Sequence, residues 1–132
     1  MRVLVDTNVV VSALLFPQSV PAQALEHAAE HAELVLTPWV LDELREVISR
    51  KAPQAGGCLE TWLAKTRFEL LVGALPGPVM RDADDQPILD VALAGAVDVI
   101  VTGDKDFLVL TLEQPLIVTP REYLDRFADP RY

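Results

Sequence analysis

Four short apolar triplets, each followed at once by a small polar turn, constrain this chain more than any other feature of its sequence. The triplets are Val3-Leu4-Val5, Leu34-Val35-Leu36, Val99-Ile100-Val101 and Leu116-Ile117-Val118. Their residues are leucine or β-branched and do not alternate with polar ones, which is typical of strands covered on both faces of a parallel sheet. The turns Thr37-Pro38 and Thr119-Pro120 favour helix starts, because threonine caps helices well and proline suits the first helical position.

Helical patterns fill the intervals between the triplets. They predict helices over residues 7–15, 21–32, 38–50, 59–71, 85–96 and 120–127, a flexible connection over 51–57 and a loop over 73–81. Strands alternating with helices indicate an α/β fold, a three-layer α/β/α sandwich around a central, mainly parallel sheet of four to five short strands. With 132 residues, we expect a single domain over 1–132.

Composition narrows the class of protein. A single cysteine, Cys58, excludes an internal disulfide and favours a reducing cytoplasm. No apolar run approaches the roughly 20 residues of a membrane span, and the N-terminus lacks the pattern of a secretory signal, so we expect a cytoplasmic protein with no membrane contact. The net charge of −9 argues against a protein that holds nucleic acid mainly by neutralising phosphates. It leaves room for one that reaches phosphates through bound cations.

The charged residues are distributed unevenly along the chain. Seven aspartates lie between residues 82 and 106, where Lys105 is the only base. Between residues 45 and 67 basic residues outnumber acidic ones, and five of them could hold a phosphate backbone: Arg45, Arg50, Lys51, Lys65 and Arg67. The pattern fits a metal site beside a phosphate-binding surface, but two ordinary solvated faces would produce it as well.

Several acidic residues are expected at one edge of the sheet. Asp6 follows the first triplet directly and Asp104 comes three residues after the third, and the carboxyl ends of parallel strands share an edge where sites form. Asp85 begins a predicted helix on its apolar stripe, although it could simply be an N-cap. Glu43 lies within the apolar stripe of the helix over 38–50, where a carboxylate needs a partner, a metal or a route to solvent.

Four convergent carboxylates would repel one another unless cations lay between them. An all-oxygen ligand set suits one or two Mg²⁺ or Mn²⁺ ions rather than zinc. Such ions activate water and stabilise charge at a phosphodiester, and either Asp85 or Asp104 could instead orient the attacking water. Asn8 and Thr102 are candidates for hydrogen bonds that hold the ligand side chains in place.

The chain resembles the PIN domain family over nearly its whole length. The resemblance lies in the order and spacing of five segments: residues 3–15 (Val3 to Leu15), Leu41-Asp42-Glu43-Leu44, Asp84 to Leu89, Val101 to Phe107, and Ile117 to Leu124. The sequence is most similar to bacterial and archaeal PIN proteins described as toxins of toxin–antitoxin pairs (VapC-like ribonucleases).

This resemblance implies a Mg²⁺- or Mn²⁺-dependent endoribonuclease that hydrolyses single-stranded or structured RNA. It implies a homodimer bound by a cognate antitoxin, and it makes the basic segment the expected path of the RNA backbone. The implied catalytic and metal-binding residues are Asp6, Glu43, Asp85 and Asp104, with Asn8, Thr102 and Asp106 in support. Asp82 or Asp84 could take the place of Asp85 if the alignment slips.

Other interpretations remain open at this point. A PIN-like fold could bind RNA or protein without cutting. A haloacid-dehalogenase-like phosphatase would use Asp6 as nucleophile, but it needs an aspartate where this chain has Asn8. His27 and His31 match an inverted zinc-protease motif, yet solvated histidines on a surface helix are the simpler interpretation. The two tryptophans, Trp39 and Trp62, are expected to be packing residues, with base-stacking platforms as the less favoured alternative. Cys58 carries no sign of a nucleophile.

Overall fold

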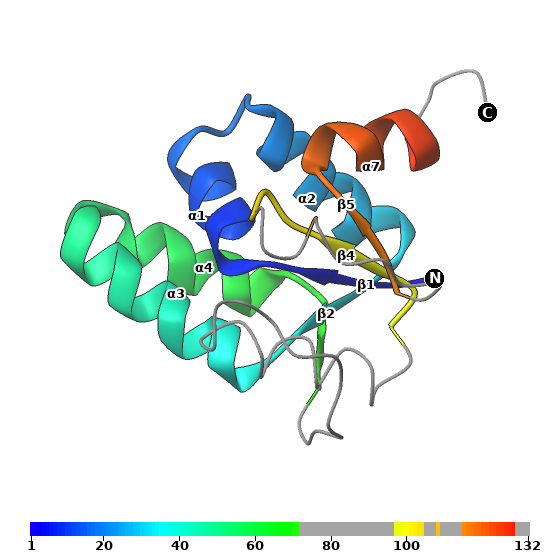
Figure 1. The fold of residues 1–132 in the computed structure, drawn as a ribbon. Helices are drawn as coiled ribbons and strands as arrows, with labels where there is room; N and C mark the ends of the chain where they lie inside the picture. The colour runs from blue at the N-terminus through cyan, green and yellow to red at the C-terminus, as the bar shows by residue number, and fades with distance from the viewer. Residues whose placement is uncertain (72–96, 105–107, 109–114, 129–132) are drawn as a thin grey trace.

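The strands form one parallel sheet at the centre of the molecule (Figure 1). The computed structural model describes residues 1–71, 97–104, 108 and 115–128. The four triplets are strands, as predicted, and a fifth short strand joins them. The strands are β1 (Arg2–Val5), β2 (Glu33–Leu36), β3 (Glu69–Leu70), β4 (Val99–Val101) and β5 (Leu116–Val118). Every neighbouring pair is parallel, in the order β3-β2-β1-β4-β5, which confirms the predicted α/β class.

The helices begin close to the predicted signals. They are α1 (Thr7–Leu15), α2 (Val20–His31), α3 (Pro38–Lys51), α4 (Gly56–Lys65) and α7 (Pro120–Phe127), with a short 3₁₀ turn, η1 (Pro53–Ala55). Thr119, at a predicted helix start, forms a capping box: its hydroxyl accepts the Glu122 N–H, and the Glu122 carboxylate accepts the Thr119 N–H, both at 3.1 Å. No helix in the described ranges is long and apolar enough to cross a membrane.

The predictions for residues 51–57 and 59–71 are wrong. The first segment is the end of α3, η1 and the start of α4 rather than a flexible connection. The second is helical only to Lys65, because its last residues pair with β2 as the edge strand β3, in the register Val35↔Glu69 and Leu36↔Leu70. Pairing with a distant strand outweighed the local helical pattern. The predicted loop over 73–81 and helix over 85–96 lie outside the described residues.

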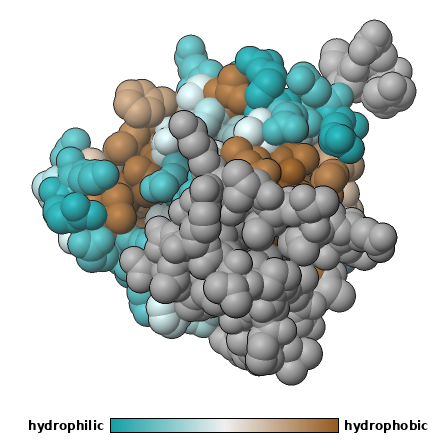
Figure 2. Space-filling view, viewed as in Figure 1, coloured by the Kyte–Doolittle hydropathy of each residue, from teal (hydrophilic) through white to brown (hydrophobic). Residues whose placement is uncertain are grey.

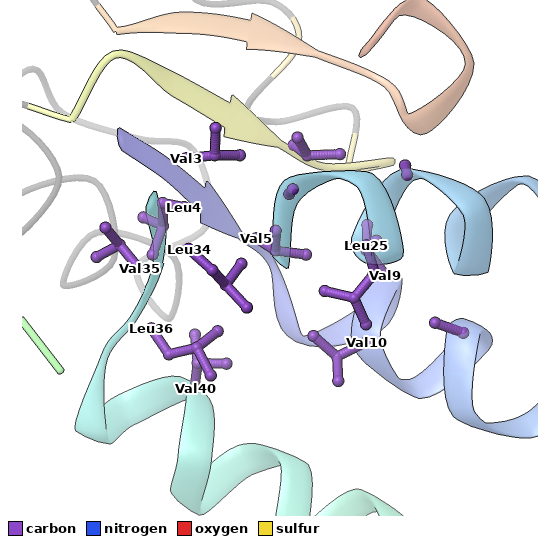
Figure 3. Packing of buried hydrophobic residues seen from close by; sticks show 14 of the residues in the cluster. Val3, Leu4, Val5, Val9, Val10, Leu25, Leu34, Val35, Leu36 and Val40 are labelled. Atoms are coloured by element: carbon purple, nitrogen blue, oxygen red, sulfur yellow. The ribbon is translucent and has the colours of Figure 1, made fainter. Parts of the chain in front are cut away.

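The order of the strands places the described helices on the sheet. The connections from β1 to β2 and from β2 to β3 step in the same direction along the sheet, so right-handed crossovers put α1 to α4 on one face. On the central strand Val3, Leu4 and Val5 are all buried, so both faces of β1 are covered. Figure 3 shows apolar side chains from β1, β2, α1, α2 and α3 gathered into one core.

Helix α7 packs on α2 through a buried tyrosine. The Tyr123 side chain is fully buried, and its hydroxyl lies 2.7 Å from Nδ1 of His27. Burial raises the pKa of Tyr123 to about 12 and lowers the pKa of His27, so both groups are neutral in this contact. The expectation of two solvated histidines therefore holds only for His31, which is exposed, because His27 bridges the two helices.

The two tryptophans differ in their surroundings. Trp62 on α4 is half-buried and packs against the core, as predicted. Trp39 at the start of α3 is 53% exposed, so the prediction that it is a packing residue is wrong. The apolar stripe of α3 is formed by its neighbour Val40 and the following buried residues, and it does not extend to the indole.

We predict that Tyr123→Phe lowers the free energy of unfolding by about 1 kcal/mol, because it removes one hydrogen bond between α2 and α7 while keeping the ring in the core. Urea denaturation followed by circular dichroism measures the change. Glu26→Gln, a change at an exposed position of α2, is the control and should leave the midpoint nearly unchanged. A Tyr123→Phe protein as stable as the wild type would show that the hydroxyl contact does not hold the helices together.

Candidate active site

The sheet register brings two polar residues together at the carboxyl edge. Val5 of β1 pairs with Val101 of β4. Asp6 and Thr102 are the next residues on these two strands, so they lie side by side where the strands end. The Asp6 N–H also donates to the Val101 carbonyl at 3.0 Å, which extends the ladder by one bond into the site.

The Asp6 carboxylate is buried, and both of its oxygens accept hydrogen bonds. Asp6 is only 4% exposed and is the N-cap of α1, where Oδ1 accepts the Thr7 N–H at 2.7 Å. Its Oδ2 accepts the Thr102 hydroxyl at 2.9 Å. A buried carboxylate without such bonds would be strongly destabilising, so the two donors fix both the position and the orientation of Asp6.

Thr102 connects Asp6 to the segment that carries Asp104. The Thr102 side chain is fully buried, and its Oγ1 accepts the Asp104 N–H at 3.0 Å while donating to Asp6. One hydroxyl thus acts as donor and acceptor at once. The backbone of Asp104 is held in place relative to the Asp6 carboxylate through this single side chain.

Glu43 reaches the same region from α3. Thr37 caps this helix, with its hydroxyl accepting the Val40 N–H at 3.0 Å, so α3 begins directly at the carboxyl end of β2 beside β1. Glu43 is partly buried between the buried Val40 and Leu44, as its place in the stripe predicted. Helical side chains lean toward the helix N-terminus, which directs Glu43 toward the edge of the sheet.

The electrostatics link the three carboxylates. Burial, the largest cause, raises the pKa of Asp6 above its ordinary value of 3.8, and the charges of Glu43 and Asp104 raise the pKa further. The hydrogen bonds from Thr102 and Thr7 act in the opposite direction. The folded chain therefore binds a proton at Asp6 more readily than the unfolded chain does. Without a cation, ionisation of Asp6 as the pH rises above 3.8 reduces the stability of the fold.

These residues suit a hard divalent cation in their chemistry. The donors are carboxylate oxygens, the ligands that Mg²⁺ and Mn²⁺ prefer, and a nearby positive charge would relieve the repulsion at Asp6. Within residues 1–71, 97–104, 108 and 115–128, however, no three carboxylate, imidazole or thiol groups lie close enough together to enclose an ion. Asp6, Glu43 and Asp104 thus interact through their charges but do not form a closed ligand set by themselves.

The other predicted site residues fall into two groups. Asn8 is exposed, and in the described part of the chain its side chain makes no hydrogen bond, so the expected contact with a ligand residue is not seen. The remaining candidates lie outside the described residues: Asp82, Asp84, Asp85 and Asp106.

Sequence reasoning did not single out Thr7. This residue is 2% exposed beside Asp6, and its Oγ1 is buried without a hydrogen-bond partner among the residues described. A buried hydroxyl in the first turn after Asp6 cannot be distinguished from an exposed one by residue type alone. Its burial follows only from the packing of α1.

The basic residues between positions 45 and 67 are less available for binding phosphates than the composition of the segment suggests. Arg45 Nε lies 3.0 Å from Glu60, and Arg50 Nε lies 3.0 Å from Glu46. Hydrophilic residues cover the outer end of the α3–α4 hairpin, at the left of the view in Figure 2.

Arg67 lies elsewhere. It lines a cavity of about 520 Å³ at the amino end of β2, away from Asp6, together with three glutamates: Glu30, Glu33 and Glu69. Lys51 and Lys65 are exposed and make no ion pair within the described ranges. The five basic candidates therefore do not form one continuous surface of uncompensated charge.

We predict that Thr102→Val lowers the free energy of unfolding by about 1–3 kcal/mol, because it leaves the Asp6 carboxylate and the Asp104 N–H without a shared partner. Denaturant unfolding in the presence of a chelator measures this loss. Thr102→Ser is the matched control, since it keeps the hydroxyl and should retain most of the stability. Equal stability of the valine and serine variants would contradict the role given to this hydroxyl.

Comparison with known proteins identifies the family to which the fold belongs. Residues 2–106 match the family model described as the PIN domain. The uncharacterized protein MJ1680 of Methanocaldococcus jannaschii is 29% identical over 142 residues, an alignment covering 96% of this chain and 91% of that protein.

Two solved structures share the fold. The structure of VapBC2 from Rickettsia felis, bound to a DNA fragment from the promoter, superposes with a TM-score of 0.66 at 21% identity, covering 89% of this chain and 97% of that one. FitAcB from Neisseria gonorrhoeae gives a TM-score of 0.60 at 18% identity, covering 90% of this chain and 98% of that one. The family match spans most of the sequence and includes Asp6, Glu43 and Asp104, and this chain belongs to the PIN domain family.

Proposed function

We propose that this protein is a Mg²⁺- or Mn²⁺-dependent endoribonuclease that hydrolyses phosphodiester bonds of RNA. The observation that carries the proposal is the buried Asp6 carboxylate, held by two hydrogen bonds and subject to the charges of Glu43 and Asp104. Burial and like charges both oppose the ionisation of this group, and a bound cation would relieve that cost. Membership of the PIN domain family supports the same assignment.

In this proposal Asp6, Glu43 and Asp104 hold the divalent ion, and Asp85 completes the ligand set. The ion supplies Lewis-acid stabilisation of the charge that develops on the phosphate, and it lowers the pKa of bound water. Two hydrogen bonds keep Asp6 in one orientation, so its oxygens are in place before the substrate arrives. Thr102 positions the Asp104 backbone in the same way, and either Asp85 or Asp104 orients the attacking water.

We propose further that the protein is the toxin of a toxin–antitoxin pair, a cytoplasmic homodimer whose site a cognate antitoxin blocks. The likeness of the fold to VapBC2 and FitAcB supports this assignment. The product of a neighbouring reading frame is the first antitoxin candidate, and it should form a stable complex with this chain and suppress cleavage.

The test of the function compares two neighbouring acids on α3. Glu43→Gln should lower Mn²⁺-stimulated cleavage of single-stranded RNA by about 100-fold or more, because removing a ligand should cost at least as much as removing a group that orients one. Asp42→Asn is the matched control: it removes one negative charge from the adjacent, exposed position and should keep full activity. Cleavage is measured on a labelled oligonucleotide with and without a chelator.

Binding of the ion is measured separately from cleavage. Mn²⁺ should raise the melting temperature of the wild type and of Asp42→Asn, but raise that of Glu43→Gln much less, because only a binding-competent site gains stability from the ion. RNA binding without cleavage in any metal would instead assign a non-catalytic binding module. Turnover of a phosphomonoester with a trapped aspartyl-phosphate would assign a phosphatase.

A second prediction concerns the exposed lysines. If the RNA backbone follows α3 and α4, Lys51→Glu and Lys65→Glu should each weaken RNA binding and reduce the slope of log affinity against log salt by about 0.7 for every phosphate that the variant no longer neutralises. Arg50→Glu should weaken binding less, because that guanidinium is already paired with Glu46. Binding and salt slopes that do not change in either lysine variant would place the backbone elsewhere.

A further inference from the structure

Trp39 is a large aromatic side chain left in solvent at the start of a helix. Its 53% exposure is among the largest for apolar side chains in the described residues, which also include Met1, Phe16 and Leu70 in this class. The described part of the chain offers its indole no hydrogen bond and no ring contact. An exposed tryptophan contributes little to the core, and its indole is open to contact with a ligand.

The helix that carries Trp39 also carries Glu43. The two residues are four positions apart on α3, so they occupy the same face and their side chains are neighbours. Because Glu43 leans toward the helix N-terminus, its carboxylate covers the turn that contains Trp39. The helix begins at the carboxyl end of β2, next to the strand β1 that precedes Asp6, so the first turns of α3 lie beside the candidate active site. The charge of Glu43 acts on Asp6, in agreement with this placement.

The backbone on either side of Trp39 is firmly held. Thr37 is 1% exposed and caps α3 through its hydroxyl, Pro38 occupies the first turn, and Val40 is fully buried in the core. The indole is therefore presented by a rigid element, and little ordering is required when a ligand packs on it. A rigid aromatic surface at the rim of a site is an efficient binding feature for this reason.

The charge of the protein favours an aromatic contact over a phosphate contact at this position. The chain carries a net charge of −9, and the two arginines of α3 are already paired with Glu60 and Glu46. Attraction of phosphates by these two arginines is accordingly reduced. Stacking on a nucleobase does not depend on net charge, since every base presents an aromatic face.

We propose that Trp39 is a platform on which a nucleobase of single-stranded RNA stacks. The stacked base would lie next to the phosphodiester that is cleaved at the site of Asp6, Glu43 and Asp104. This inference rests on the proposed function and names a residue that would position an unpaired nucleotide beside the site. A base within a duplex is already stacked on its neighbours, and its face is not available to the indole. Loops and single-stranded segments present such faces.

The fluorescence of Trp39 tests directly whether a base stacks on its indole. The chain has two tryptophans, so Trp62→Phe leaves Trp39 as the sole reporter. In a chelator, which prevents metal-dependent cleavage, a short single-stranded RNA should change the Trp39 emission. The same oligonucleotide with abasic residues, or the corresponding duplex, should not. An emission that does not respond to any of the three RNAs would overturn the proposal.

Substitution of Trp39 supplies the second measurement. Trp39→Ala and Trp39→Leu should weaken binding of single-stranded RNA by about 5-fold to 100-fold, whereas Trp39→Phe should retain much of the affinity because it keeps an aromatic face. The abasic oligonucleotide should bind wild type and Trp39→Ala alike. In cleavage assays, KM should rise more than kcat falls. Phe16→Ala removes an exposed aromatic on the α1–α2 turn and should leave RNA affinity unchanged.

The outcomes separate this inference from the proposed function. Metal-dependent cleavage that Trp39→Ala leaves unchanged in both affinity and KM would overturn the inference while the ribonuclease stands. If a base stacks on Trp39 but no metal supports cleavage, the proposed ribonuclease activity is wrong and Trp39 is still an RNA contact. If Trp39→Ala changes the oligomeric mass or abolishes antitoxin capture while RNA binding is unaltered, Trp39 is a protein contact and the inference is wrong.

Discussion

The candidate site depends on one buried carboxylate at the end of the central strand. Asp6 directly follows β1, caps α1 and accepts a hydrogen bond from the hydroxyl of Thr102, which directly follows the adjacent strand β4. The two hydrogen bonds offset part of the loss of hydration that burial imposes, so the fold tolerates a group that it would otherwise exclude. Burial still raises the pKa of Asp6 above its ordinary value, and the charges of Glu43 and Asp104 add to that shift. The site is thus well ordered and electrostatically unfavourable at the same time, a combination that a bound cation would resolve.

The sequence was informative wherever local rules decide structure. Buried parallel strands lack alternation, so the four triplets identified them, and the threonine caps located the starts of α3 and α7. Topology supplied the next step, because the carboxyl ends of neighbouring parallel strands must meet at one edge. The carboxylates of Asp6, Glu43 and Asp104 could therefore be assigned to one region without any knowledge of their distances, and the action of the Glu43 and Asp104 charges on Asp6 agrees with that assignment.

Sequence reasoning failed where partners are distant or where exposure decides. Residues 69–70 follow a helical pattern locally, yet they pair with β2, and nothing in the local pattern indicates that pairing. Arg45 finds Glu60 on a different helix, so a basic segment in composition is partly neutralised in space. Trp39 looked like a packing residue because most tryptophans are, and only the orientation of α3 shows that its indole faces solvent. Each failure concerns a tertiary contact that composition and periodicity do not encode.

The placement of Trp39 and Glu43 on one rigid helix has a consequence for specificity. Four residues span roughly 6 Å along the axis, slightly more than one helical turn, so helix geometry fixes the axial separation of Trp39 and Glu43. A base that stacks on the indole would therefore set which phosphodiester enters the site. Because any base can stack, this arrangement selects an unpaired position rather than a sequence. Discrimination among bases would then require contacts to their edges, which neither the metal ligands nor an aromatic face can provide.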